Sequence, residues 1–135
     1  IENRVPLIAI PSLPAGLCLW QGAREVLPNS EIYIGAIPED INKNSGIFLY
    51  VDQISSGNEL LEKLIKIKNQ NIASRQIRVI TALASSPGLK KIGESITDLT
   101  IYCACIDEEL TNKGDIMPGI GNPIARINSR FQPPN

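Results

Sequence analysis

One segment of the chain carries residue types that could hold a phosphorylated sugar. An acid, Asp52, precedes the small polar run Ser55-Ser56-Gly57-Asn58, which follows an apolar stretch and leads into a predicted helix. Free amides and the helix dipole at such a helix start favour an anion, while the hydroxyls add donors and glycine allows close approach. The same pattern is also typical of a capping turn, with Asp52 as a solvated acid at a strand end.

A second segment, residues 114–122, combines glycine, proline and apolar residues near the C-terminus. Flat heterocycles are often recognised by backbone N–H and C=O groups, and glycines expose these groups. Side chains of Ile116, Met117 and Ile120 would cover the ring. The composition is equally typical of a surface connection rich in glycine and proline.

Both segments need a scaffold, and the remaining sequence predicts one. Short apolar runs predict buried strands at 5–10, 31–37, 47–51, 77–83 and 99–106. Helical spacing predicts a helix from Leu17 to Leu27 and another over 57–70, in which Leu60, Leu61, Leu64 and Ile65 face the core. Ser86 is predicted to cap a third, short helix that begins at Pro87. Residues 107–135 are predicted to be mostly loop, with one helical turn near 124–128.

Strands that alternate with helices predict an α/β fold with a mostly parallel sheet flanked by helices. The 135 residues suffice for a single domain with a substantial core. We predict one domain over 1–135, with a tail at 114–135 that is mostly loop. In such sheets ligands bind beyond the carboxyl ends of the strands, which is where the Asp52 segment is predicted to lie.

The amino-acid composition limits the partners and the catalytic groups that this chain could use. Thirteen Lys and Arg against fourteen Asp and Glu give a net charge of −1, which does not favour nucleic acid as a partner. No apolar run approaches the ~20 residues that span a bilayer. The chain has no His, which excludes a His base, a Ser-His or Cys-His nucleophile and a His-bound zinc. Catalysis would depend on amides, carboxylates, hydroxyls, Lys, Arg or a metal held by oxygen.

Three cysteines are present, at positions 18, 103 and 105. Cys103 and Cys105 lie two apart in a predicted strand and so share one face. We interpret them as small buried residues in a reducing compartment. A metal or redox pair is the alternative, but the chain offers no further soft ligand beyond Cys18. No metal site is predicted from side chains.

Taken together, the segments resemble the uracil phosphoribosyltransferase family, which has the type I phosphoribosyltransferase fold. The resemblance covers nearly the whole chain. It includes Leu13-Pro14-Ala15-Gly16-Leu17, the loop from Asp52 to Asn58 and Ala84-Ser85-Ser86-Pro87-Gly88. Its most specific part is Ile106-Asp107-Glu108 followed by Asn112, Gly114, Pro118-Gly119-Ile120-Gly121 and Arg126.

The resemblance implies an activity and a set of site residues. Members of the family transfer ribose 5-phosphate from phosphoribosyl pyrophosphate to uracil, with Mg²⁺ assisting the departure of pyrophosphate. By resemblance, Ala15 and Gly16 lie near the pyrophosphate, and Asp52 is the weak candidate for a catalytic acid. Ser55, Ser56, Gly57 and Asn58 would hold the 5-phosphate. The uracil site would comprise Ile116, Met117, Gly119, Gly121 and Asn122.

Several departures from the family pattern fall on charged positions. The Arg before the Ala-Gly of the first loop is Pro14 here, which offers neither a guanidinium nor an N–H. The phosphate loop of the family continues as Gly-Ser, whereas this chain has Asn58 and Glu59. An ungapped alignment places Asp52 one residue late. The Arg-Asp pair after the second strand, the following flexible arm and the N-terminal segment of the family are absent from this sequence.

Three functions remain open on this basis. The first is a degenerate homologue without efficient turnover that serves as a structural or binding subunit. The second is an active uracil phosphoribosyltransferase. The third is a sensor of uracil or a nucleotide. Mg²⁺ is expected as cofactor only if it is active. By resemblance a homodimer is expected, with membership of a larger assembly as the alternative. Composition fits a cytoplasmic or plastid-stroma location.

Overall fold

The structure is a computed structural model, and it describes residues 5–119. Two members of the predicted uracil site, Gly121 and Asn122, lie outside these residues, as does the helical turn predicted near 124–128. Among the helices within 5–119, none is long and apolar enough to cross a membrane.

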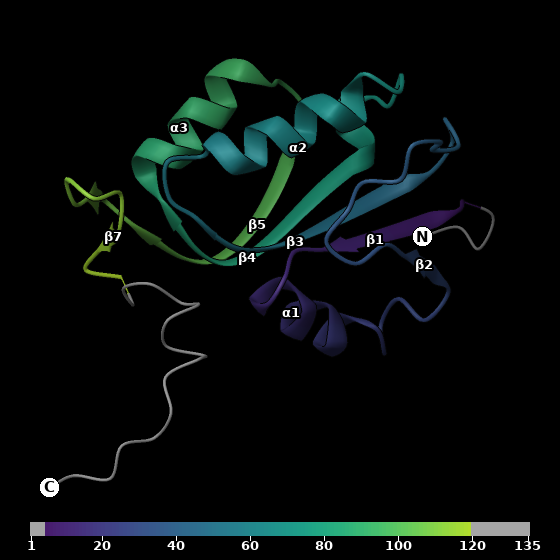
Figure 1. The fold of residues 1–135 in the computed structure, drawn as a ribbon, viewed down its shortest axis with the longest axis horizontal. Coiled ribbons are helices and arrows are strands. Elements are labelled where there is room, and N and C mark those ends of the chain that lie inside the picture. The colour runs from purple at the N-terminus through teal and green to yellow at the C-terminus, as the bar shows by residue number, and fades with distance from the viewer. Residues whose placement is uncertain (1–4, 120–135) are drawn as a thin grey trace, which may run out of the picture.

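A five-stranded sheet forms the centre of the molecule (Figure 1). Its strand order is β2-β1-β3-β4-β5, and every neighbouring pair is parallel. The predicted α/β class with a mostly parallel sheet is therefore confirmed. The strands span Leu7–Pro11 (β1), Ser30–Ile32 (β2), Gly46–Ile54 (β3), Ile77–Ser85 (β4) and Thr100–Asp107 (β5).

Three helices cover the sheet unequally. Helices α2 (Asn58–Lys68) and α3 (Ser86–Ser95) lie on one face, and α1 (Ala15–Ala23) lies on the other, as Figure 1 shows. A 3₁₀ turn, η1 (Ser74–Gln76), precedes β4. On its face, α1 packs mainly against β1 and β3, so β5 is left without a helix there.

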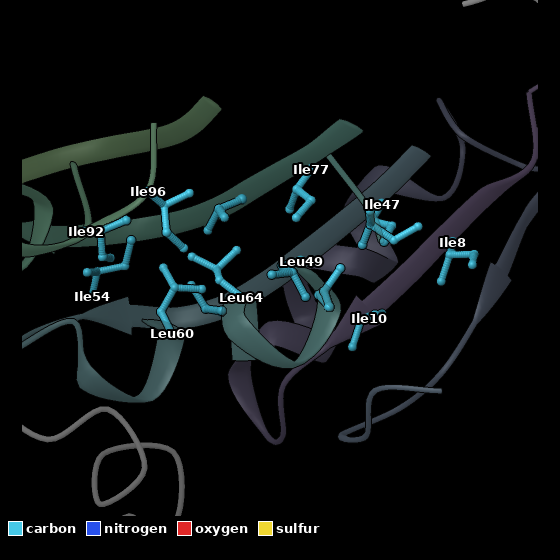
Figure 2. Close-up of a cluster of buried hydrophobic side chains, with 14 of the residues drawn as sticks. Ile8, Ile10, Ile47, Leu49, Ile54, Leu60, Leu64, Ile77, Ile92 and Ile96 are labelled. Carbon is cyan, nitrogen blue, oxygen red and sulfur yellow. The ribbon is translucent and has the colours of Figure 1, made fainter. Parts of the chain in front are cut away.

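The core lies between the sheet and the helices α2 and α3 (Figure 2). Leu64 and Ile67 of α2 and Ile92 of α3 are at most 1% exposed, and they belong to the same buried cluster as Ile47 and Ile77 of the sheet, both completely buried. Burial of each such side chain stabilises the fold by about 1.5–3 kcal/mol. This face fixes the positions of β3, β4 and the loops that follow them.

Local details correct several predictions. Helix α1 ends at Ala23 rather than Leu27, and β2 has three residues instead of seven, because the connecting segment turns away as a loop. Ile65 is 47% exposed, whereas Ile67 is fully buried. Leu60 and Leu64 are buried and Leu61 packs against the core, as predicted, so the prediction was wrong for Ile65 and missed Ile67. The orientation of the helix determines which of several adjacent apolar residues face the sheet.

Two further predictions were wrong at the ends of β4 and β5. The cap of α3 is Ser85, not Ser86: its hydroxyl accepts a hydrogen bond from the Gly88 amide at 3.0 Å. The region after β5 was expected to be loop, but β6 (Glu109–Leu110) and β7 (Ile116–Met117) pair there as an antiparallel ribbon. Gly114, at φ +84°, allows the turn that joins them.

Candidate ligand-binding site

Four loops meet at one edge of the sheet. The parallel strands β1, β3, β4 and β5 all end there, and they are followed by the loop into α1, the loop into α2, the start of α3 and the β6–β7 ribbon. This edge is where open α/β sheets bind ligands. The structure thus brings the two chemically suggestive segments of the sequence to the same side of the fold.

The loop after β3 has the geometry of an anion site at a helix start. Gly57 precedes α2 in the left-handed conformation, with φ +79°, and the start of α2 has no side-chain cap at that position. The Ser56 hydroxyl accepts a long hydrogen bond, 3.4 Å, from the Asn58 amide. Ser56 and Asn58 are exposed. The Asn58 amide is thus only weakly bonded at an exposed helix start, where a phosphate group would be stabilised.

The start of α3 holds the loop after β3 in place. The completely buried hydroxyl of Ser85 donates to the carbonyl of Ser55 while it accepts from the Gly88 amide. A Cβ atom on Gly88 would stand 2.2 Å from the Ser55 carbonyl oxygen, so only glycine fits. Neither contact was evident from the sequence beyond the Ser-Ser-Pro-Gly pattern. The backbone of the loop is therefore held rigidly by a separate element.

A lysine that the sequence analysis missed reaches this loop. The Lys91 ammonium, from α3, donates to the side-chain oxygen of Asn58. Lys91 is exposed, and it forms no ion pair with a described carboxylate. One cation is therefore supplied to the phosphate loop from outside it. Its position three residues after Gly88, about one turn along α3, was the available signal.

The first turn of α1, which contains Gly16, is tied to β3 by an internal acid. Asp52 accepts a hydrogen bond from the Gly16 amide at 2.7 Å. Burial is the main cause that raises the pKa of Asp52 above its ordinary value, with Glu59 adding to the rise, while the Gly16 amide and Lys63 lower it. Gly16 itself is buried against β3, where a Cβ atom would stand 2.3 Å from the Tyr50 carbonyl oxygen. The Asp52 carboxylate thus accepts a hydrogen bond from the Gly16 amide, the amide that was expected to face pyrophosphate.

A second unpredicted lysine lies beside the same loop. The Lys63 ammonium donates to the Ser12 hydroxyl at 2.7 Å and pairs with Glu59 at 3.2 Å. Its side chain is only 23% exposed, whereas that of Glu59 is 85% exposed. Lys63 therefore links the start of α2 to the loop before α1. Ser12 and Lys63 are 51 residues apart in the chain, so their contact depends on the fold.

Little space remains between these groups. The cavity lined by Ser12, Asp52, Gln53, Glu59 and Lys63 has a volume of ≈ 40 Å³, enough for about one water molecule. The buried side-chain oxygen of Gln53 has no hydrogen-bond partner among the described residues. The cavity is consequently small and rich in acceptor oxygens, a poor environment for a diphosphate.

These residues also do not fit a Mg²⁺ site. Mg²⁺ requires oxygen ligands in a near-octahedral arrangement. Here the Asp52 carboxylate is bound to an amide, and the Glu59 carboxylate is paired with an ammonium group. Among residues 5–119, no cluster of three or more His, Cys, Asp or Glu could hold a metal. We therefore derive no step that depends on a bound metal.

The β6–β7 ribbon forms the other half of the site. Asp107, at the end of β5, accepts a hydrogen bond from the Gly119 amide at 2.8 Å. Gly119 has φ +43°, and a Cβ atom there would stand 2.1 Å from the Ile116 carbonyl oxygen. Asp107 therefore positions the glycine loop, a role that its place at a strand end could have indicated.

A hollow of ≈ 430 Å³ lies over this ribbon. Met117 lines this hollow, whereas Ile116 is 2% exposed and belongs to the interior. The volume falls within the range of small-molecule sites. The residues that line the hollow are Ile106, Asp107, Glu108, Glu109, Met117 and Pro118.

The cysteines are arranged differently from the prediction. Cys105 and Cys18 are exposed and Cys103 is half-buried, so the expected burial of the β5 pair was wrong for Cys105. The physical reason is that β5 is the edge strand of the sheet and is paired on one side only. Cys103 and Cys105 remain free thiols in the structure.

A parallel five-stranded sheet with an anion loop after β3 and a glycine loop beyond β5 defines a phosphoribosyltransferase-like domain. A family model described as uracil phosphoribosyltransferase matches residues 1–127. The chain therefore belongs to the uracil phosphoribosyltransferase family, as the sequence resemblance implied.

Relatives support this assignment at moderate identity. The uracil phosphoribosyltransferase of Synechococcus elongatus is 32% identical over 94% of this chain and 66% of its own length. The chloroplastic enzyme of Arabidopsis thaliana is 32% identical over 90% of this chain and 47% of its own length. A solved structure, the AQ2163 protein of Aquifex aeolicus, superposes with a TM-score of 0.82 at 26% identity, over 95% of this chain and 67% of that protein. The chain thus spans about two thirds of the length of the bacterial relative.

Proposed function

We propose that this protein is a degenerate member of its family, a structural or binding subunit without efficient transferase activity. The observation that carries the proposal is the hydrogen bond from the Gly16 amide to the Asp52 carboxylate. This amide belongs to the loop that the family resemblance assigns to pyrophosphate. A diphosphate would have to displace Asp52 from it, at a cost of about 1.5–3 kcal/mol for a charge-assisted hydrogen bond.

Two neighbouring changes oppose pyrophosphate further. Pro14 directly precedes the loop and offers neither a cation nor an amide hydrogen. Glu59, in the first turn of α2, places a second carboxylate near the cavity and occupies Lys63. An anion at this position would meet acceptor oxygens on more than one side. The fold is kept, while the binding energy for the leaving group is reduced.

Isothermal titration calorimetry with phosphoribosyl pyrophosphate and Mg²⁺ tests the proposal. We expect weak binding, with a dissociation constant near or above the millimolar range, equivalent to about 4 kcal/mol. Inorganic phosphate serves as a comparison ligand, because the loop before α2 could bind it without the pyrophosphate loop. Micromolar binding of phosphoribosyl pyrophosphate would contradict the proposal.

The main alternative is an active uracil phosphoribosyltransferase. The well-supported loop after β3 and the two lysines that reach the loops, Lys63 and Lys91, favour it. Under this alternative the purified protein forms uridine monophosphate, and Lys91→Ala raises the KM for phosphoribosyl pyrophosphate several-fold. The matched control Lys90→Ala, on the exposed surface of α3, leaves the KM unchanged. An absence of product at high enzyme concentration rules this alternative out.

A lesser alternative is a sensor for uracil or a nucleotide. The hollow of ≈ 430 Å³ beside the Gly119 loop supports it, because it lies apart from the blocked pyrophosphate loop. A thermal-shift titration with uracil and uridine monophosphate tests it. A saturable rise in Tm that is lost in Asp107→Ala would favour the sensor, whereas no shift favours a purely structural subunit.

We also infer a homodimer, or membership of a larger assembly, and a location in the cytoplasm or the plastid stroma. The similarity to the chloroplastic enzyme of Arabidopsis thaliana supports the second location. Fluorescence microscopy of the tagged full-length protein, in the organism that encodes it, checks the location.

A further inference from the structure

The edge strand β5 carries two thiols and an acid on one face. Cys103, Cys105 and Asp107 alternate along the strand, so their side chains project to the same side of the sheet. Cys103 is half-buried and packs against the core, whereas Cys105 is exposed. The proposed function gives neither thiol a role. The Cys105 thiol is therefore a nucleophilic group at the surface whose purpose is still open.

A line of contacts joins Cys105 to the Gly119 loop. The Cys105 thiol donates a weak hydrogen bond to one carboxylate oxygen of Asp107, at 3.9 Å. The other oxygen of Asp107 accepts a hydrogen bond from the Gly119 amide at 2.8 Å. Asp107 forms no ion pair within residues 5–119. A charge added at the Cys105 sulfur would therefore act directly on the carboxylate that positions Gly119.

The neighbouring thiol is poorly placed to form a disulfide with Cys105. Side chains two residues apart on one face of a strand are separated by about 6.6 Å, whereas bridged cysteines have Cβ atoms about 3.8 Å apart. Cys103 is paired with Thr81 of β4 in the register of the sheet. Cys105 is likewise paired with Leu83. Because a bridge would require this paired strand to buckle, Cys103 does not displace a small thiol attached to Cys105.

We propose that Cys105 is a modification site for anionic small disulfides of the oxidised glutathione type, and that the modification releases the Gly119 loop by repelling Asp107. The Cys105 thiolate attacks one sulfur of the small disulfide. A new S–S bond forms, the old one breaks, and the departing thiolate takes up the proton that Cys105 has lost. The disulfide itself is the oxidant, so no other is required.

The modification changes two things beside Asp107. The S–H donor of Cys105 is lost, and the attached tripeptide brings carboxylates to the end of β5, next to a carboxylate that is already negative. Like charges at this distance repel, which weakens the hold of Asp107 on the Gly119 amide. The inference goes beyond the proposed function and does not depend on it, because the thiol reacts in the same way in a catalytic and in a non-catalytic member of the family.

Hydrogen exchange at the Gly119 amide, measured by NMR on the full chain, tests the proposal. The variant Cys18→Ser removes the other exposed thiol, so oxidised glutathione can be directed to Cys105, and mass spectrometry of peptides locates the adduct. We expect the Gly119 amide to exchange about threefold faster, or more, in the adduct than in the unmodified variant. Dithiothreitol should restore the original rate.

Matched adducts separate charge from bulk and from position. Cystamine attaches a cationic aminoethyl thiol to the same sulfur, and we expect that adduct to leave the Gly119 exchange rate unchanged. In Cys105→Ser, oxidised glutathione modifies Cys18 instead, and that adduct also leaves the rate unchanged. Asp107→Asn keeps an acceptor for the Gly119 amide but carries no charge, so the glutathione adduct at Cys105 should not alter exchange in that variant.

Three results would overturn the proposal. The first is an absence of any adduct at Cys105 in the folded full chain, which would show that this thiol is covered. The second is a disulfide between Cys103 and Cys105 as the main product. The third is a Gly119 exchange rate that the glutathione adduct leaves unchanged, or that the cystamine adduct raises equally.

Discussion

At the scale of residues, the account depends on what Asp52 binds. Asp52 was expected to be a solvated acid or a weak candidate for a catalytic acid, and the structure joins its carboxylate to the Gly16 amide at 2.7 Å. Lys63 and Glu59 complete the group around the same cavity. The Asp52 carboxylate thus takes the position that a bound anion would have beside the Gly16 amide and Lys63.

Removal of the Asp52 charge should open the loop to anions. In Asp52→Asn we expect pyrophosphate to bind about tenfold more tightly, equivalent to ~1.4 kcal/mol, as measured by calorimetry. Glu62→Gln is the matched control, since Glu62 is an exposed acid of α2 that forms no ion pair with a described residue. Equal affinities in the wild type and in Asp52→Asn would show that Asp52 does not block the loop.

The pH dependence of stability provides a second test of Asp52. Its pKa is raised in the folded state, chiefly by burial, so the folded protein holds this proton more tightly than the unfolded chain. The contribution of Asp52 to stability is therefore present below its ordinary pKa of 3.8 and is lost as the pH rises through the raised value. Urea unfolding measures the free energy of unfolding of the wild type and of Asp52→Asn. As the pH rises, this free energy should fall in the wild type relative to the variant. A difference independent of pH would contradict this.

At the scale of elements, the start of α3 supports the phosphate loop. Gly88 approaches the Ser55 carbonyl too closely for any side chain, while Gly93, in the same helix, has nothing within 4 Å of an added Cβ atom. These two glycines offer a matched pair of substitutions.

We expect opposite effects from alanine at the two positions. Gly88→Ala should destabilise the protein by about 1–3 kcal/mol through overpacking, and it should displace the loop after β3. Gly93→Ala should stabilise the protein by roughly 0.5–1 kcal/mol, because alanine favours the helix. Chemical denaturation measures both. Destabilisation by Gly93→Ala as large as that by Gly88→Ala would contradict the packing described.

Helix α2 permits a similar comparison of neighbours. Leu64 is fully buried, whereas Ile65 is 47% exposed. Leu64→Ala should cost about 2–5 kcal/mol of unfolding free energy, and Ile65→Ala well under half as much. Equal costs would show that α2 is rotated from its position in the structure.

At the scale of the whole molecule, the sequence predicted the sheet and the edge at which the site lies. The apolar runs of β1, β3, β4 and β5 were sufficient, because buried parallel strands are recognisable from composition. It could not predict the contact of Lys63 with Ser12 or that of Lys91 with Asn58, since each joins residues far apart in the chain. The cap at Ser85 was missed by one residue because two serines precede Pro87. Whether cationic groups reach the loops was likewise a question that only the packing could answer.

The most direct test of the whole account is the formation of uridine monophosphate from radiolabelled uracil, phosphoribosyl pyrophosphate and Mg²⁺. The Synechococcus elongatus relative, assayed in parallel, is the positive control. We predict product from that enzyme and none above background from this protein, at equal concentration and over hours. Turnover by this protein within a few-fold of the control would contradict the claim that its pyrophosphate loop is blocked.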